Sequence, residues 1–286
     1  MKWFIKPSAR QLCCFVLVAL SYVILGKLGL LFARVNPSIS AIWPPTGLAI
    51  ASLLIFGIRL WPAIFLGACI VNVTTVPSIL PTLGIATGNT LEALVATIVV
   101  RRFANGLQAF ALPRTIVSYV FWAGIVSTMV SAIVGVATLA IFHQLSPSLY
   151  ITAFITWWLG DMGGAIIVAP LILLWTFDPM IRLNKTKTPE FILLFLFVIA
   201  VSAIVFSPSF PYPYLFFVPV LWSAFRFNLR ETMTVIFLIA LISVRATALG
   251  YGPFVGGGID AGYDLWYLQL FLIILTLAKL TVALLS

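Results

Sequence analysis

Ten apolar runs, separated by charges, prolines and glycines, account for most of this chain. Hydrophobic residues make up 63% of the sequence and charged residues only 8%, whereas about a quarter of a soluble domain is charged. A folded chain of 286 residues could not cover its surface in water with so few charges. The sequence therefore predicts an all-α polytopic transmembrane helical bundle and excludes a soluble globular domain.

The apolar runs are the predicted transmembrane segments, and three of them are short. A perpendicular crossing needs about 20 residues, and the second, third and eighth runs fall below that length. Eight full spans is therefore the alternative to ten. Either number is even and places both termini on one side. The runs are 8–33, 42–57, 60–76, 81–100, 114–142, 149–176, 189–206, 213–225, 230–249 and 264–286.

The basic residues indicate which side that is. Lys and Arg concentrate in cytoplasmic loops of membrane proteins, and twelve of the 16 fit an N-in, C-in arrangement. The opposite loops, 72–81, 143–148, 207–213 and 250–263, contain none. The net charge of +9 is thus a topology signal, and no nucleic-acid partner is expected. The fitting residues are Lys2, Lys6, Arg10, Arg59, Arg101, Arg102, Arg114, Arg182, Lys185, Lys187, Arg226 and Arg230.

Reactive side chains are too few for most catalytic or metal chemistry. The three cysteines, Cys13, Cys14 and Cys69, lie in apolar runs, and His143 is the single histidine. These residues give no disulfide framework or zinc site, and the sequence holds no phosphate-binding or dinucleotide-binding loop. We expect no metal, no cofactor, no catalytic residue and no enzyme activity from this chain itself.

Two acids inside predicted spans are the leading functional candidates, because charge in a span is costly. Counted at 1.5 Å per residue from the outer helix starts, Glu92 and Asp161 both lie roughly 16–18 Å deep. If they are adjacent, both cannot be ionised without a cation between them. Lys27 and Arg245 in the outer third are candidate counter-charges. The alternatives are a purely structural pair and snorkelling of the basic side chains.

The residues around the acids predict a polar cavity with an aromatic wall. Gly84, Gly88 and Glu92 share one helix face that lets a neighbour approach closely, and Gly160, Gly163 and Gly164 flank Asp161. Ordinary helix packing is the alternative explanation of these glycines. The two prolines after Trp43 belong to the first turn of a helix or to a break before it, where helix N–H groups favour an anion. The candidate ligand-binding residues are Glu92, Asp161, Asn89, Trp158, Trp157, Asn72, Trp43, Lys27 and Arg245.

Six stretches and the single residue Asn72 together resemble the membrane-associated sensor domain, type one of the MASE group. The resemblance implies one integral sensory domain, 1–286, in the bacterial inner membrane. In that family a histidine kinase, a GGDEF or EAL module, or PAS domains follow; such an output module would come after residue 286. The stretches are Ser40–Gly47 (SAIWPPTG), Arg59–Ala68 (RLWPAIFLGA), Asn72, Gly84–Leu94 (GIATGNTLEAL), Trp157–Leu171 (WWLGDMGGAIIVAPL), Leu221–Arg230 (LWSAFRFNLR) and Gly250–Phe254 (GYGPF).

These observations favour a signal-input domain whose last helix, 264–286, carries the signal. Gln269 and Lys279 are the candidate polar residues of that helix. The expected partners are the lipid bilayer, a small-molecule or ion stimulus, a cytoplasmic kinase or cyclase module in cis or in trans, and a second copy in a homodimer. A transporter of a small molecule or ion is the alternative, since midplane acids and broken helices are typical of transporters. An intramembrane enzyme ranks third.

Overall fold

The computed structural model describes residues 8–31, 40–177, 187–207, 212–255 and 261–282, and these ranges consist of helices and the connections between them, without a strand. They form ten helical runs, one for each predicted segment. The first five are α1 (Ala9–Leu30), α2 (Pro44–Phe56), Ile58–Val73 with α3 (Trp61–Val73), α4 (Ile79–Phe103), and Pro113–Ile141 with α5 (Pro113–Tyr119) and α6 (Ser127–Ile141). The others are Pro147–Phe177 with α7 (Tyr150–Gly163) and α8 (Ala169–Phe177), α9 (Lys187–Val205), α10 (Phe217–Arg226) after a short turn, α11 (Leu229–Ala248) and α12 (Ala261–Val282).

Six of these described helices are long and apolar enough to cross a membrane, so the chain is a multi-pass membrane protein. They are α1, α4, Pro113–Ile141, Pro147–Phe177, α9 and α11. The three segments predicted to be short are short: α2 and α3 have 13 residues each and α10 has 10. At 1.5 Å per residue they extend roughly 15–20 Å, which is less than the hydrocarbon core of about 30 Å.

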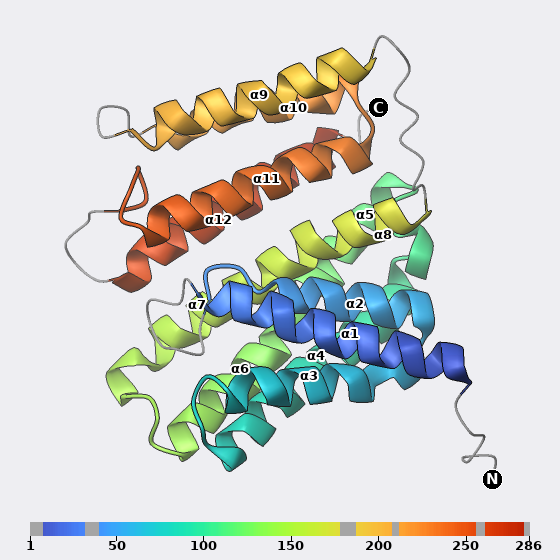
Figure 1. Ribbon diagram of the computed structural model, residues 1–286, viewed down its shortest axis with the longest axis vertical. Coiled ribbons are helices and arrows are strands. Elements are labelled where there is room, and N and C mark those ends of the chain that lie inside the picture. The colour runs from blue at the N-terminus through green and yellow to red at the C-terminus, as the bar shows by residue number, and fades with distance from the viewer. Residues whose placement is uncertain (1–7, 32–39, 178–186, 208–211, 256–260, 283–286) are drawn as a thin grey trace.

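Successive helical runs alternate in direction, so the bundle has two distinct ends (Figure 1). The helices α1–α8 form one group and α9–α12 lie beside it, joined through contacts of α12 with α7 and of α11 with α8. The start of α1 and the end of α12 lie at the same end of the bundle. That arrangement agrees with an even number of crossings. Which end faces the cytoplasm remains a prediction from the charges.

The glycine face predicted on α4 is the surface against which α6 packs. A Cβ at Gly84 would lie 2.5 Å from the Thr138 side chain, and one at Gly88 would lie 3.0 Å from Val134. Both distances are shorter than two carbon atoms tolerate, so the absent side chains set how closely the helices approach. These glycines serve helix packing, and Glu92 lies further along the same face.

Three basic side chains donate to carbonyls near the ends of the short helices, where backbone N–H donors become few. The Lys27 ammonium donates to the Val71 carbonyl of α3 at 3.2 Å and to Thr75 at 2.8 Å. The Arg101 guanidinium donates to the Leu53 carbonyl of α2 at 3.0 Å. Lys279 donates to the Ala224 carbonyl of α10 at 3.3 Å. A helix that ends inside a membrane needs such donors because lipid supplies none.

Two of the long helices contain π-helical turns, at Val120–Val126 and Gly164–Val168. The second turn precedes Pro170, which has no N–H to donate. The Ala169 N–H donates to the Gly164 carbonyl, five residues earlier. In the same pattern, an N–H at position 170 would donate to the Ala165 carbonyl. The Tyr119 hydroxyl donates to that carbonyl at 2.8 Å. The tyrosine thus replaces the donor that proline lacks.

Candidate functional site

The two membrane acids meet at the first turn of α2. Thr46 Oγ1 lies 3.2 Å from Glu92 Oε2 and 3.1 Å from Asp161 Oδ1. Pro44 and Pro45 occupy the first two helical positions, as the sequence predicted, and this fixes Thr46 as the third. One side chain of α2 therefore connects α4 to α7. The two carboxyl oxygens that Thr46 contacts lie no farther apart than the sum of these two distances.

Both acids are shielded from solvent and lipid by the rest of the protein. Glu92 is 1% exposed and Asp161 is 0% exposed. One oxygen of each, Glu92 Oε1 and Asp161 Oδ2, is buried and has no hydrogen-bond partner. Unpaired buried oxygens are costly and are expected at sites that exchange protons or ligands. The prediction that the acids lie at similar depth facing the bundle interior agrees with this geometry.

A chain of neutral polar groups lies next to the acids. The Asn89 amide donates to the Tyr22 hydroxyl at 3.0 Å and accepts from Ser131 at 2.9 Å. The Trp157 indole N–H donates to Ser131 at 3.1 Å. Ser131 also interacts with both carboxyl groups, so the acids and this chain form one buried cluster. Helices α1, α2, α4, α6 and α7 each contribute to it.

The glycines around Asp161 accommodate a piece of backbone, residues 40–43, which precedes α2. The Trp43 N–H donates to the Gly160 carbonyl at 2.9 Å. A Cβ at Gly160 would lie 2.7 Å from the Ser40 carbonyl oxygen, and one at Gly164 would collide with the Trp43 carbonyl oxygen. The space that the sequence assigned to a cavity is thus filled by the 40–43 segment, because only glycine lets two backbones approach so closely.

Helix α12 holds the other side of the 40–43 segment. The Gln269 amide donates to the Ala41 carbonyl at 2.9 Å and to the Thr156 carbonyl of α7 at 2.9 Å. Gln269 is 1% exposed, and its own oxygen is unpaired. The predicted signalling helix is therefore bonded to the segment that leads directly into Thr46.

Several residues predicted for the site lie elsewhere. Lys27 bonds to the end of α3 and Arg245 is exposed on α11, so neither is placed as a counter-charge to the acids. Asn72 is buried but donates to the Ala68 carbonyl of its own helix at 2.9 Å. The Trp158 indole donates to the Ile125 carbonyl at 3.1 Å. Trp43, by contrast, is buried beside Tyr22 among apolar residues of α1–α4, and its side chain interacts with the Tyr22 hydroxyl, so it borders the cluster. Depth can be counted from sequence, but the direction of a side chain around its helix depends on neighbours.

Three members of the cluster were not predicted: Tyr22, Thr46 and Ser131. Thr46 lies within the Trp43–Gly47 stretch that was noted for its prolines, so its position at a helix start was the available signal. Tyr22 and Ser131 carry no signal in one sequence, since single hydroxyl side chains are common in membrane helices.

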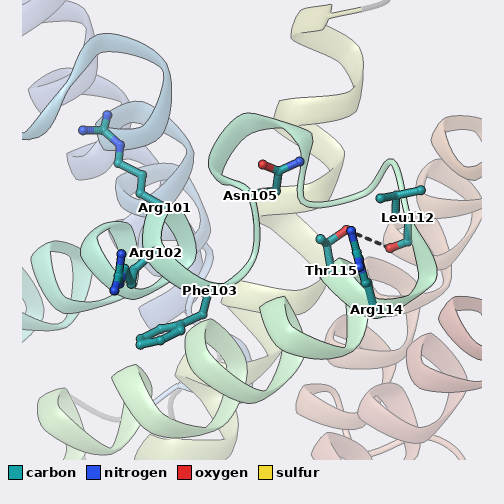
Figure 2. A pocket seen from close by; sticks show the side chains of 7 residues that line it. All are labelled: Arg101, Arg102, Phe103, Asn105, Leu112, Arg114 and Thr115. Atoms are coloured by element: carbon teal, nitrogen blue, oxygen red, sulfur yellow. Dashed lines mark hydrogen bonds between the residues drawn. The ribbon is translucent and has the colours of Figure 1, made fainter.

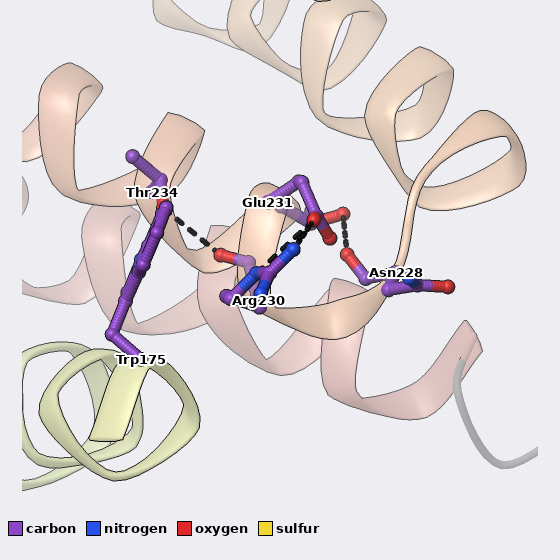
Figure 3. A network of polar contacts seen from close by, with 6 residues as sticks. Trp175, Asn228, Arg230, Glu231 and Thr234 are labelled. Atoms are coloured by element: carbon purple, nitrogen blue, oxygen red, sulfur yellow. Dashed lines mark hydrogen bonds and ion pairs between the residues drawn. The ribbon is translucent and has the colours of Figure 1, made fainter. Parts of the chain in front are cut away.

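A second buried charged group lies at the start of α11 (Figure 3). The Arg230 guanidinium pairs with Glu231 and lies 4.8 Å from the centre of the Trp175 ring of α8. The Trp175 indole in turn donates to Thr234 at 3.0 Å. At the same end of the bundle Glu190 of α9 pairs with Arg226 of α10 at 2.7 Å. These contacts join α8 to α11 and α9 to α10, and Lys279 joins α12 to α10.

A surface pocket of about 420 Å³ lies where α4 ends and α5 begins (Figure 2). Arg102, Arg114, Asn105 and Thr115 contribute polar groups to its lining, and Arg101 also borders it. The positive lining agrees with the prediction that this end is cytoplasmic. The pocket lies eleven residues beyond Glu92 along α4, roughly 16 Å away, so it is separate from the acid cluster.

The sequence of the chain was compared with known proteins. The model of the MASE1 family matches residues 14–286, which is nearly the whole chain. The chain belongs to the MASE1 family. A MASE1 chain is a membrane sensory domain of signalling proteins, and the resemblance seen in the sequence is thereby confirmed. No curated protein and no solved structure matches this MASE1 chain.

Proposed function

We propose that this MASE1 domain, in a bacterial inner membrane, detects a stimulus at the Glu92–Asp161 pair and passes the change through α12 to a cytoplasmic output module. The module is a histidine kinase or a GGDEF diguanylate cyclase, in cis or in trans. The domain itself is not an enzyme. The domain couples the Glu92–Asp161 pair to α12.

One observation carries this proposal: Gln269 of α12 holds the backbone of the 40–43 segment, and Thr46, three residues after that segment, bridges the acids. The first turn of α2 cannot shift relative to the acids without affecting the bonds to α12. A stimulus that binds one arrangement of Thr46 more tightly than another would therefore also favour one position of α12.

A change of charge at the acids involves enough free energy to shift the packing of the bundle. A charge near the midplane of a membrane costs several kcal/mol. A two-state balance is displaced substantially by a few kcal/mol. Gain or loss of charge at Glu92 or Asp161 is therefore sufficient to change which packing of the bundle is populated.

The test is Asp161→Asn in the chain joined after residue 286 to a diguanylate cyclase module, with cyclic-di-GMP read in cells. Asparagine keeps the shape of the side chain and removes its charge. We expect output to change at least about fivefold, the effect of a coupling energy of about 1 kcal/mol, with protein abundance unchanged. Asp264→Asn, on α12 but outside the cluster, is the matched control and should leave output unchanged.

The transporter alternative makes the opposite prediction for the same variant. Unchanged cyclase output together with loss of solute uptake into vesicles would replace the sensory role with transport. Equal changes in Asp161→Asn and Asp264→Asn would also contradict the proposal, because they would show that output responds to any lost carboxylate.

A further inference from the structure

We infer that the Glu92–Thr46–Asp161 cluster binds one small cation, a proton or Na⁺, and that this cation is the ligand of the site. The inference deepens the proposed function, on whose sensory role it rests, by assigning the chemical class of the stimulus. The acid pair supplies two negative charges to a buried space. The contacts of Thr46 with the two acids need one more hydrogen atom than the Thr46 hydroxyl has.

The hydrogen atoms can be counted from the contacts. Thr46 Oγ1 lies within hydrogen-bond distance of an oxygen of each acid, at 3.2 Å and 3.1 Å. A hydroxyl has a single hydrogen and can donate to only one of them. The other contact joins two acceptors unless that carboxyl carries a proton and donates to Oγ1. One added proton therefore completes the bridge between Glu92 and Asp161.

The surrounding groups do not supply the missing positive charge. Among the described residues, the recorded ion pairs are Arg226–Glu190 and Arg230–Glu231, and neither includes these acids. The side chains that face the pair are Tyr22 from α1, Thr46 from α2, Asn89 from α4, Ser131 from α6 and Trp157 from α7. Tyr22 is the titratable one among these five, and its hydroxyl accepts from Asn89. The start of α2 contributes about half a positive charge, which offsets a quarter of the charge of two carboxylates.

The two unpaired oxygens provide the second reason for a cation. Glu92 Oε1 and Asp161 Oδ2 are buried and make no hydrogen bond. With the bridged oxygens and Thr46 Oγ1, they make a set of five oxygen ligands from three helices. Hard cations prefer oxygen ligands, and acids inside membrane spans mark ion pathways and proton relays. A proton and Na⁺ would satisfy the same requirement for one positive charge.

The experiment uses the purified chain in lipid nanodiscs and infrared difference spectroscopy. A neutral carboxylic acid has a carbonyl stretching band that carboxylates and amides lack. In sodium-free buffer at neutral pH, we expect such a band in the unsubstituted protein and its loss in Glu92→Gln and in Asp161→Asn. The matched control Asp264→Asn should keep it. Circular dichroism and gel filtration report whether each variant is folded.

The sodium arm distinguishes the two cations. Loss of the band on adding Na⁺, with retention of radioactive sodium by the protein and not by Asp161→Asn, would show that Na⁺ replaces the proton. A band unaffected by Na⁺ would show that the ligand is the proton alone. Either result supports the inference.

Two results would overturn it. One is the absence of the band from the unsubstituted protein at neutral pH together with no bound sodium, which needs no variant to fold. The other is persistence of the band in both folded single variants, which would place the proton elsewhere. A bound cation combined with unchanged cyclase output in Asp161→Asn would instead reject the sensory role and leave the cation site standing.

Discussion

The Thr46 hydroxyl is the side-chain group of α2 that contacts both acids. A hydrogen bond between membrane helices is worth about 0.6–1.7 kcal/mol. Thr46 takes part in two, so its removal affects both carboxyl groups at once. The methyl group of Thr46 is not needed for either contact.

Thr46→Val should therefore destabilise the protein by about 1–3 kcal/mol, the value of two such bonds, while Thr46→Ser should retain most of the stability. Valine has the shape of threonine without the hydroxyl. The measurement is unfolding in detergent followed by circular dichroism, with both variants compared with the unsubstituted protein. Equal stability of the valine and serine variants would mean that the hydroxyl does not bridge the acids.

Among single residues, the sequence predicted the two acids but not Tyr22, Thr46 and Ser131, three other members of the cluster. Counting along the fixed rise of a helix placed Glu92 and Asp161 at one level, and Thr46 contacts both of them. The same counting made Lys27 a candidate counter-charge, whereas its ammonium donates to the Val71 carbonyl and the Thr75 hydroxyl at the end of α3. A basic residue in a span has two uses, offsetting an acid or ending a helix, and only the positions of neighbouring helices decide between them.

Among the elements, α12 has polar contacts at two levels of the bundle. Gln269 holds the 40–43 segment, and Lys279, ten residues further on, bonds to the end of α10. Ten residues correspond to roughly 15 Å along a helix. A shift of α12 along its axis would therefore strain polar contacts at both levels.

Gln269→Leu should uncouple the site from the output. Leucine has a similar volume but cannot donate to the Ala41 and Thr156 carbonyls. We expect the output change caused by Asp161→Asn to be largely lost in the Gln269→Leu background, a non-additive result typical of coupled residues. The measurement is the cyclic-di-GMP output of the single and double variants.

The control for this cycle is Tyr267→Phe, because Tyr267 lies on the same helix and is 66% exposed. In that background Asp161→Asn should retain its full effect. Simple addition of the effects of Asp161→Asn and Gln269→Leu would contradict transmission through the 40–43 segment.

Element boundaries show what one sequence can and cannot predict. The consecutive prolines predicted the start of α2, since proline fits only the first turn of a helix. The π-helical turns before Ser127 and Pro170 were not predicted, because a π-turn is stabilised by groups from other helices, such as the Tyr119 hydroxyl. The hydropathy of a sequence indicates the length of an apolar segment but not its contacts with other helices.

For the whole molecule, the alternation of helix direction and the positions of basic residues agree. The end of α4, the start of α5 and the end of α10 lie at the end of the bundle where α1 starts (Figure 1), and these helix ends carry Arg101, Arg114 and Arg226. The number and order of segments could be predicted because long apolar runs have few alternatives in lipid. The pairing of α7 with α12 and of α8 with α11 could not, since it depends on complementary surfaces.

The orientation is tested with two single cysteines, Ser146→Cys and Gln108→Cys, in a background without Cys13, Cys14 and Cys69. Both positions are exposed; position 108 lies in the α4–α5 connection and position 146 in the α6–α7 connection, and these connections are at opposite ends of the bundle. A membrane-impermeant thiol reagent added to intact cells should label position 146 and not position 108, because basic loops stay in the cytoplasm. Permeabilised cells, in which both positions should react, provide the control. The reverse pattern in intact cells would invert the topology.

The bond between Gln269 and Ala41 joins residues that are 228 positions apart, and this separation affects how the protein is made. Contacts between distant parts of a chain form late, and a chain is synthesised from its N-terminus. Until α12 emerges from the ribosome and inserts, the Ala41 carbonyl lacks this donor, although α2 can already pack against α1, α4 and α8. The acid cluster can therefore form before α12 is in place, whereas the contact that joins the 40–43 segment to α12 forms later.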